Sequence, residues 1–292
     1  MRSRYDWVIW TGFVAGLVLT LGLVVVPVLG GIWLSFHSAE SFIATPRWVG
    51  LANYAKLLVD AGFWRATLNG LVYALASVVL QLVLGVGFAV VLNRRFPLRG
   101  VVRGLAILPY LLPTVVVGVT FQWMTDGSFG VITALTRALG LGVIPWFESP
   151  LAAMTSVVLI SVWLWTPFVT VSCLAAMQSI PPVLYEAAKV DGASSWSRFW
   201  HVTVPQLMHV LGVVGLLRAI WMFNKFDVIW LLTKGGPLGA TETLPVLAYN
   251  RAFNLFDVGG GAAVATMGFL VLSTFLALYF RLTSRDREQL AR

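Results

Sequence analysis

The sequence predicts an all-α polytopic membrane protein with six transmembrane helices. Of its 292 residues, 59% are hydrophobic and only 11% are charged, and the mean hydropathy is +0.86. This composition excludes an ordinary soluble globular protein. Apolar runs long enough to cross a bilayer recur along the chain, because a helical span needs about 20 predominantly apolar residues. We therefore expect a single transmembrane domain over residues 1–292.

The six predicted spans are separated by polar or glycine-containing segments. They cover residues 7–36, 66–92, 102–124, 151–176, 205–232 and 258–282. The first is too long for the core of a secretory signal peptide, so we expect it to be retained. Pro109 and Pro113 break the hydrogen-bond ladder of the third, which a membrane tolerates only where neighbouring helices, side chains or water satisfy the freed carbonyls. The third span is expected to be irregular, and it either lines the protein interior or carries a passive kink.

The distribution of basic residues indicates the topology. Twelve of the 20 Lys and Arg residues flank the spans on one side, and six lie on the other. The twelve are Arg2, Arg4, Arg94, Arg95, Arg99, Arg103, Lys189, Arg198, Arg281, Arg285, Arg287 and Arg292. By the positive-inside rule, both termini and the segment 177–204 face the cytoplasm. The basic residues are scattered between apolar runs, so they do not indicate nucleic-acid binding.

The segment 177–204 is the longest polar insertion that keeps clear helical signals. Ser179 is a candidate N-cap ahead of two prolines, and Asp191-Gly192 supplies a residue that tolerates positive φ to end this helix. Ser194 or Ser195 can cap a second short helix. Three aromatic residues fall at helical spacing on that second helix: Trp196, Phe199 and Trp200. We expect a helix–turn–helix elbow at the membrane surface.

The first helix of this elbow offers groups for docking a second protein. Glu186 and Asp191 place carboxylates near the ends of a short helix, and Ala187 and Ala188 permit close approach of another surface. A cytosolic partner with Arg or Lys side chains would pair with the carboxylates. The alternative is an amphipathic interfacial helix that only covers the protein's own bundle.

The elbow also resembles a known motif. The matching residues are Glu186-Ala187-Ala188, Asp191-Gly192-Ala193, Phe199 and Val204-Pro205. This pattern resembles the EAA loop of permease subunits of binding-protein-dependent ABC importers, in the carbohydrate branch related to the maltose transporter permeases. The resemblance implies the type I ABC importer permease fold, with 177–204 as a cytoplasmic coupling loop. It assigns coupling to an ATPase to Glu186, Ala187, Ala188, Asp191, Gly192, Ala193 and Phe199.

Segments outside the elbow are also similar to this family. Val49-Gly50-Leu51-x-Asn53-Tyr54 is similar to its first external loop, and Asn224-Lys225-Phe226-Asp227 is followed by a similar Thr233-x-Gly235-Gly236-Pro237. The chain departs from the maltose F-type subunit, which carries additional amino-terminal helices and a large external domain. Only residues 37–64 lie between the first two predicted spans, so we expect a compact six-helix form.

The resemblance implies an assembly of several chains in the cytoplasmic membrane of a bacterium or archaeon. The chain would pair with a second homologous permease as a heterodimer and bind two ATPase subunits and an extracytoplasmic solute-binding protein. A sugar or related polyhydroxylated solute would cross by alternating access. ATP and Mg would be used by the partner ATPase, and we expect no cofactor bound by this chain.

The fifth predicted span carries unusual polar residues: Arg218, Trp221, Asn224, Lys225 and Asp227. A charge near the bilayer centre costs on the order of 2.5–3.5 kcal/mol unless it is paired or hydrated. One hypothesis is a substrate path in which Trp221 and Asn224 contact the solute. The other is structural, with Lys225 and Asp227 pairing locally or reaching the membrane surface.

The sequence carries no motif of an enzyme. It has no Gly-x-x-x-x-Gly-Lys loop, so ATP hydrolysis must come from another chain. His-Glu-x-x-His and Gly-x-Ser-x-Gly are also absent, and the three histidines are not clustered, so we expect no metal site. The alternatives are an ion-coupled secondary transporter using Asp227 or Arg218, a membrane scaffold, and an ABC importer of a non-sugar solute such as glycerol phosphate.

Overall fold

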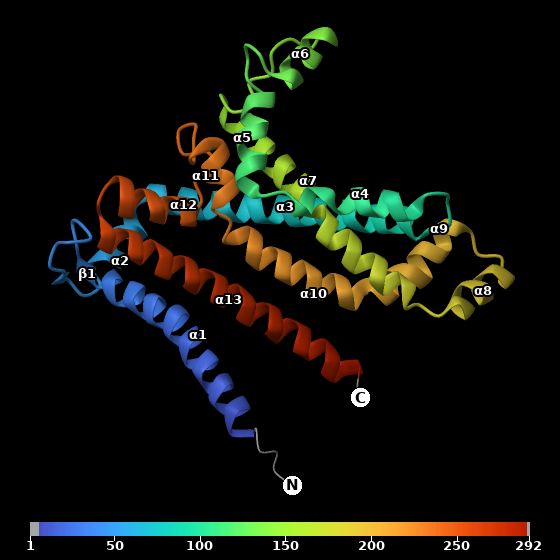
Figure 1. Ribbon diagram of the computed structural model, residues 1–292, viewed down its shortest axis with the longest axis horizontal. Coiled ribbons are helices and arrows are strands. Elements are labelled where there is room, and N and C mark those ends of the chain that lie inside the picture. The colour runs from blue at the N-terminus through green and yellow to red at the C-terminus, as the bar shows by residue number, and fades with distance from the viewer. Residues whose placement is uncertain (1–5, 291–292) are drawn as a thin grey trace. The chain divides into compact units, whose positions relative to one another are not determined.

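The computed structural model describes residues 6–290 and is built almost entirely of helices (Figure 1). Within this range, five helices are long and apolar enough to cross a membrane, and a bent helix pair counted as one span makes six. This confirms the predicted all-α polytopic fold. Arg2, Arg4 and Arg292, which contribute to the predicted topology, lie outside the described residues.

The described chain divides into two compact units. Unit 1 combines the chain up to Trp64 with the chain from Leu247 onward, and unit 2 is the continuous stretch Arg65–Val246. The single transmembrane domain predicted over residues 1–292 stays a prediction.

Unit 1 contains two long helices and a short strand pair. Its elements are α1 (Asp6–Ser35), β1 (His37–Ser38), β2 (Arg47–Trp48), α2 (Ala52–Val59), the π-helical turn η2 (Asn250–Asn254) and α13 (Val258–Leu290). The strands pair antiparallel, with His37 opposite Trp48. α1 packs along α13 (Figure 1). None of the most apolar stretch of α1 is buried, so this surface is available to lipid or to another chain.

Several contacts hold unit 1 together, including a hydrogen bond of 3.0 Å from the N–H of Val258, at the start of α13, to the carbonyl of Ala39. Asn53 of α2 donates hydrogen bonds to the carbonyls of Ser35 and His37, each at 2.9 Å. The backbone of Gly259 lies directly against His37, where a Cβ would not fit. Arg251 and Asp60 form an ion pair that joins η2 to the end of α2.

Unit 2 is arranged around the long helix α7. Its elements are most of α3 (Ala61–Asn93), α4 (Arg99–Leu111), α5 (Thr114–Met124), α6 (Val131–Ala138), α7 (Pro150–Gln178), α8 (Pro182–Val190), α9 (Ser195–Arg198), the π-helical turn η1 (Phe199–Thr203), α10 (Val204–Phe223), α11 (Asp227–Thr233) and the start of α12 (Leu244–Tyr249). In its most apolar stretch 72% of α7 is buried, against 33% for α3, so α7 is the central helix.

Two predicted spans are divided in the structure. In the span predicted at 102–124, α4 and α5 meet at an angle of 91°. Pro113 lies at this break and has no N–H with which to continue the ladder of α4. The span predicted at 205–232 is interrupted between α10 and α11, where the Asn224 side chain donates to the carbonyl of Ile220 at 3.1 Å.

A side chain from one broken span satisfies the backbone of the other. Gln122 of α5 donates through Nε2 to the carbonyl of Leu231 in α11 at 2.8 Å. The last carbonyls of a helix have no partner within it, so a membrane protein must supply one from a neighbour. The irregularity predicted for the third span is present, and it is tied to α11.

Gly85 permits the close approach of α3 to α7. A Cβ added at Gly85 would lie 2.5 Å from Cγ1 of Val169, whereas a Cβ at Gly87 would meet nothing within 4 Å. We expect Gly85→Ala to lower the stability of the purified protein by roughly 1–3 kcal/mol, the usual cost of overpacking a core. The measurement is the unfolding temperature in mild detergent.

The control for this prediction is Gly87→Ala on the same helix. It should leave the unfolding temperature unchanged or raise it slightly, because alanine favours the helix more than glycine does. Equal effects of the two substitutions would show that α3 and α7 are not in contact at Gly85.

Candidate functional site

The elbow predicted for 177–204 is present between α7 and α10. α8 and α9 are joined by a turn in which Gly192 has φ 76°. This left-handed conformation strains residues that carry a Cβ. The N–H of Ala193 donates to the carbonyl of Ala188 at 2.9 Å, which closes the end of α8. The prediction that Ser179 caps the first helix is wrong: its hydroxyl donates to Ala176 at 2.8 Å and ends α7 instead.

The second helix of the elbow is held by side-chain hydrogen bonds. Ser194 is its N-cap, and its Oγ accepts from the N–H of Ser197 at 3.1 Å. Arg198 donates through Nη1 to the carbonyl of Ala193 at 2.6 Å and through Nη2 to Oγ of Ser195 at 3.1 Å. These contacts fix the angle at which the chain leaves the turn.

The predicted coupling residues lie on α8, in the turn that follows it and at the start of η1, and most of them are exposed. Glu186, Ala187, Asp191 and Gly192 are exposed, and three others are half-buried: Ala188, Ala193 and Phe199. No residue of α8 is buried. Neither of the two carboxylates takes part in an ion pair among residues 6–290.

The exposed face of α8 also carries apolar side chains. Val183 is 62% exposed and Val190 is 88% exposed. Two carboxylates without an ion pair in the described chain therefore lie beside small and aliphatic residues, and Arg or Lys side chains of another protein could pair with them. The assignment of these residues to ATPase coupling stays a prediction.

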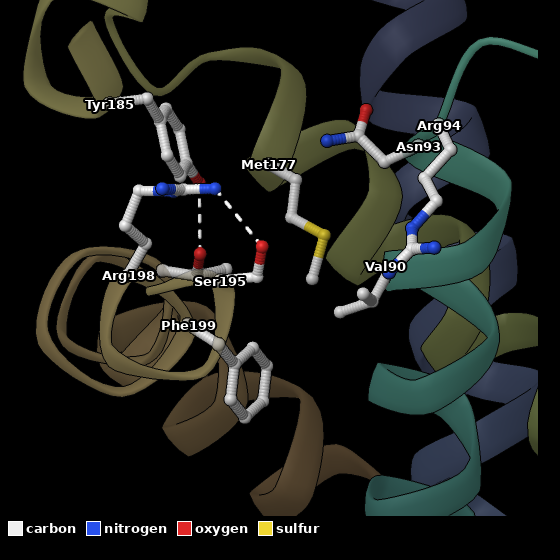
Figure 2. A pocket seen from close by; sticks show the side chains of 9 residues that line it. Val90, Asn93, Arg94, Met177, Tyr185, Ser195, Arg198 and Phe199 are labelled. Carbon is white, nitrogen blue, oxygen red and sulfur yellow. Dashed lines mark hydrogen bonds between the residues drawn. The ribbon is translucent and has the colours of Figure 1, made fainter. Parts of the chain in front are cut away.

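The elbow is tied to the base of α10. Tyr185 of α8 and Thr203 of η1 share a hydrogen bond between their hydroxyl groups at 3.0 Å. Both residues line a pocket of about 190 Å³ next to the end of α3 (Figure 2). α8 is therefore attached to the rest of unit 2, because it contacts the segment that leads into α10.

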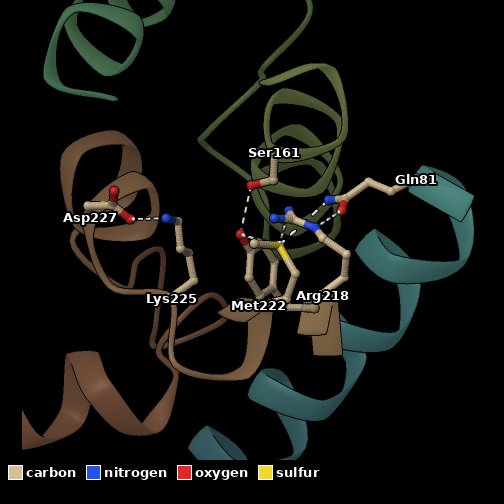
Figure 3. A network of polar contacts seen from close by, with 7 residues as sticks. Gln81, Ser161, Arg218, Met222, Lys225 and Asp227 are labelled. Atoms are coloured by element: carbon tan, nitrogen blue, oxygen red, sulfur yellow. Dashed lines mark hydrogen bonds and ion pairs between the residues drawn. The ribbon is translucent and has the colours of Figure 1, made fainter. Parts of the chain in front are cut away.

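The buried centre of unit 2 is a polar network around Arg218 (Figure 3). Arg218 of α10 is 2% exposed and donates through Nε to Oε1 of Gln81 at 2.7 Å. Its Nη2 lies 3.6 Å from Sδ of Met222. Tyr73 and Ser161 complete the network through a hydroxyl–hydroxyl bond of 2.7 Å. The network joins α3, α7 and α10.

Aromatic rings surround the guanidinium. The Cζ atom of Arg218 lies 5.7 Å from the ring centre of Trp165, 5.6 Å from that of Trp221 and 6.0 Å from that of Phe168. Each ring within about 6 Å stabilises the cation through its quadrupole. No carboxylate pairs with Arg218 in the described part of the chain.

The other polar residues of the fifth predicted span lie around the break. Lys225 Nζ is 3.3 Å from Oδ1 of Asp227 and 3.9 Å from the ring centre of Trp165. Trp221 is 43% exposed, and Asn224 is exposed with its amide bonded to its own helix. The structure thus brings Arg218, Trp221 and Lys225 to the same aromatic cluster. It leaves Asn224 outside this cluster, and Asp227 reaches it only through Lys225.

Sequence reasoning missed the residues of α3 and α7 in this network. Tyr73, Gln81, Ser161, Trp165 and Phe168 were not identified as site residues. A signal for Gln81 was present, because an uncharged but polar amide stands in the middle of an apolar span. Such groups seek hydrogen-bond partners inside the protein. The identity of the partner depends on a contact 137 residues away along the chain.

We expect Gln81→Leu to destabilise the purified protein by roughly 1.5–3 kcal/mol, because a hydrogen bond to a buried charge is lost. Adding Arg218→Met should recover part of this loss, since the unpaired charge is removed as well. Thermal unfolding of the single and double variants measures both effects. Gln206→Leu, an exposed position of α10, is the control. Additive losses in the double variant would contradict a direct Gln81–Arg218 interaction.

Comparison with known proteins places the chain among transport components. The model of the family described as binding-protein-dependent transport system inner membrane component matches residues 81–289. The trehalose/maltose transport system permease protein MalF of Thermococcus litoralis is 38% identical over 272 residues, which cover 93% of this chain and 92% of that protein. The sulfoquinovosyl glycerol transport system permease protein SmoG of Agrobacterium fabrum is 32% identical over 269 residues, 92% of this chain and 87% of SmoG.

A solved structure shows the same fold. A chain of a bacterial ABC transporter involved in the import of the acidic polysaccharide alginate superposes with a TM-score of 0.84 at 20% identity, covering 97% of this chain and 96% of that one. The predicted type I permease fold is confirmed, and the protein is a transport subunit, not an enzyme. These findings favour the ABC importer over the ion-coupled alternative. The chain belongs to the family of binding-protein-dependent transport system inner membrane components.

Proposed function

We propose that this chain is a permease subunit of an ATP-driven ABC importer for a sugar or a related polyhydroxylated solute. The observation that carries the proposal is the 38% identity, over nearly the whole chain, to a trehalose/maltose permease. The exposed and unpaired carboxylates of the elbow support it, because they offer a docking surface to a separate ATPase. The chain binds no cofactor in this proposal, and ATP and Mg are used by that ATPase.

The partners in this proposal are a second homologous permease, two ATPase subunits and an extracytoplasmic solute-binding protein. One related solved transporter is a complex with an alginate pentasaccharide-bound periplasmic protein, which supports a binding protein as a partner. The exposed apolar surface of α1 provides area for the second permease. The protein lies in the cytoplasmic membrane with both termini and the elbow in the cytoplasm, as the distribution of basic residues favours.

The mechanism in this proposal is alternating access. Closure of the ATPase dimer moves α8, and the hydrogen bond between Tyr185 and Thr203 carries this movement to the start of α10. α10 in turn carries Arg218 and Trp221. A small displacement of the elbow therefore changes the relative populations of two packings of the helices.

The substrate path in this proposal includes Arg218, Trp221, Asn224, Lys225 and Asp227. Trp221 is the best candidate for direct contact, because its ring is partly exposed beside the Arg218 cluster. Aromatic faces and a few placed polar groups are typical of sites for small solutes. Arg218 itself is enclosed, so its role is to hold the aromatic rings in place.

We expect Glu186→Ala to abolish copurification of a P-loop ATPase with the tagged protein in mild detergent. The recovered ATPase should fall by at least about tenfold, because removing one partner of a charge pair buried at an interface costs roughly 2–5 kcal/mol. Mass spectrometry of the copurified chains measures this. Glu148→Ala, another exposed carboxylate, is the control and should retain the ATPase. Absence of any ATPase with the wild-type chain would refute the proposed function.

We expect Trp221→Ala to raise the half-saturating sugar concentration for uptake by roughly two- to tenfold, which corresponds to about 0.5–1.5 kcal/mol of aromatic contact. Uptake of labelled disaccharide by cells that express the chain with its partners is the measurement. Trp123→Ala, at an exposed position of α5, should leave uptake unchanged. Normal uptake by Trp221→Ala would exclude this residue from the path. Uptake of glycerol phosphate but no sugar would support the non-sugar alternative.

A further inference from the structure

The pocket of about 190 Å³ beside the elbow has a basic lining that the proposed function does not use (Figure 2). It lies where the end of α3 meets the end of α7, α8 and the α9–η1 segment. Six polar residues contribute to its lining: Asn93, Arg94, Tyr185, Ser195, Arg198 and Thr203. None of the residues that line it is Asp or Glu, so its charge is positive.

The two arginines retain unused donors. Arg94 follows the end of α3, is exposed, and its guanidinium makes no hydrogen bond or ion pair within residues 6–290. Arg198 uses one N–H for Ala193 and one for Ser195, and a guanidinium has five. Guanidinium groups with free donors match the oxygen atoms of phosphate.

The shape of the pocket favours a headgroup over a single ion. Arg94 and Arg198 stand on opposite sides of it, with Met177 and Val90 between them (Figure 2). An inorganic phosphate is compact. A headgroup that contains a phosphodiester and hydroxyl groups is longer, and it presents acceptors and donors to both sides.

Exposed tryptophans give an independent indication of the surroundings of the pocket. Trp196 is 70% exposed and Trp200 is 48% exposed, and both belong to the α9–η1 segment that also supplies Arg198. Their rings pack on each other with centres 5.6 Å apart. Tryptophan is enriched at the level of the lipid headgroups, so this segment and the pocket beside it lie at that level.

We propose that the pocket binds the headgroup of an anionic phospholipid, with its phosphate on Arg94 and its polar end towards Arg198. Basic pockets between transmembrane helices on the cytoplasmic side bind such headgroups. The assignment of this lipid to the cytoplasmic leaflet rests on the orientation given in the proposed function. The binding of the lipid to the pocket does not depend on that orientation. A bound lipid connects α3 to the elbow and stabilises the arrangement in which both line the pocket.

The test uses the delipidated full chain in neutral detergent, titrated with phosphatidylglycerol and followed by native mass spectrometry. Arg94→Gln should weaken binding of the first lipid by about tenfold, as expected for the loss of charge-assisted hydrogen bonds. Arg95→Gln is the matched control, because it removes the same charge from the next residue, which does not line the pocket. The control should change the affinity by less than about twofold, since exposed charges act weakly.

Three results would overturn the proposal. Equal losses for Arg94→Gln and Arg95→Gln would show a general attraction to basic residues and no site. Equal binding of zwitterionic phosphatidylcholine would remove the role of the anionic charge. In the third result, inorganic phosphate protects the chain from unfolding through Arg94 while phosphatidylglycerol gives no protection. That result would assign the pocket to a soluble anion.

Failure of this proposal can be distinguished from failure of the proposed function. Lipid binding is measured on the purified chain and needs no ATPase, binding protein or sugar. If the chain binds phosphatidylglycerol through Arg94 but copurifies with no ATPase, the lipid site is supported and the proposed importer function is refuted. A chain that copurifies with an ATPase but binds phosphatidylglycerol independently of Arg94 would support the importer and contradict the lipid site.

Discussion

The guanidinium of Arg218 is buried in unit 2, and no carboxylate of the described chain neutralises it. Its charge is stabilised by one amide from α3, by Trp165 and Phe168 of α7, and by Trp221 of α10. Burial of an unpaired charge costs several kcal/mol, so the arrangement holds only while all three helices remain in contact. The packing of α3 on α7 at Gly85 serves the same requirement, because it brings α3 close to α7.

The elbow could be predicted from sequence because its determinants are local. Gly192 occupies a left-handed conformation, and Ser194 caps the helix that follows within three residues. Such signals act between near neighbours, and they identify the helices and the turn without knowledge of the fold. The error at Ser179 is of the same kind: a serine before two prolines fits an N-cap, but the hydroxyl also fits the preceding helix end.

The Arg218 network could not be predicted in the same way. The sequence indicates that Arg218 needs partners, yet it does not say that Gln81 supplies the acceptor or that three rings surround the charge. Those choices depend on which faces of α3, α7 and α10 meet, and helix periodicity in a nearly uniform apolar chain does not define faces. The break between α4 and α5 was predicted because Pro113 has no N–H. The interruption between α10 and α11 contains no proline, so the sequence gives no such signal there.

In the proposed mechanism, the elbow and the buried network are parts of one mechanical path. α8 has no buried side chain, so by itself it would respond to a docked protein without moving the membrane helices. The Tyr185–Thr203 hydrogen bond and the contacts of Arg198 with Ala193 and Ser195 remove this freedom. η1 then continues into α10, whose Arg218 is fixed among α3 and α7. Movement of the elbow must therefore either bend α10 between Thr203 and Arg218 or shift the Arg218 cluster. Separating the guanidinium of Arg218 from its partners costs free energy. Small rigid displacements of α10 that keep the Arg218 cluster intact are therefore the favoured response to movement of the elbow.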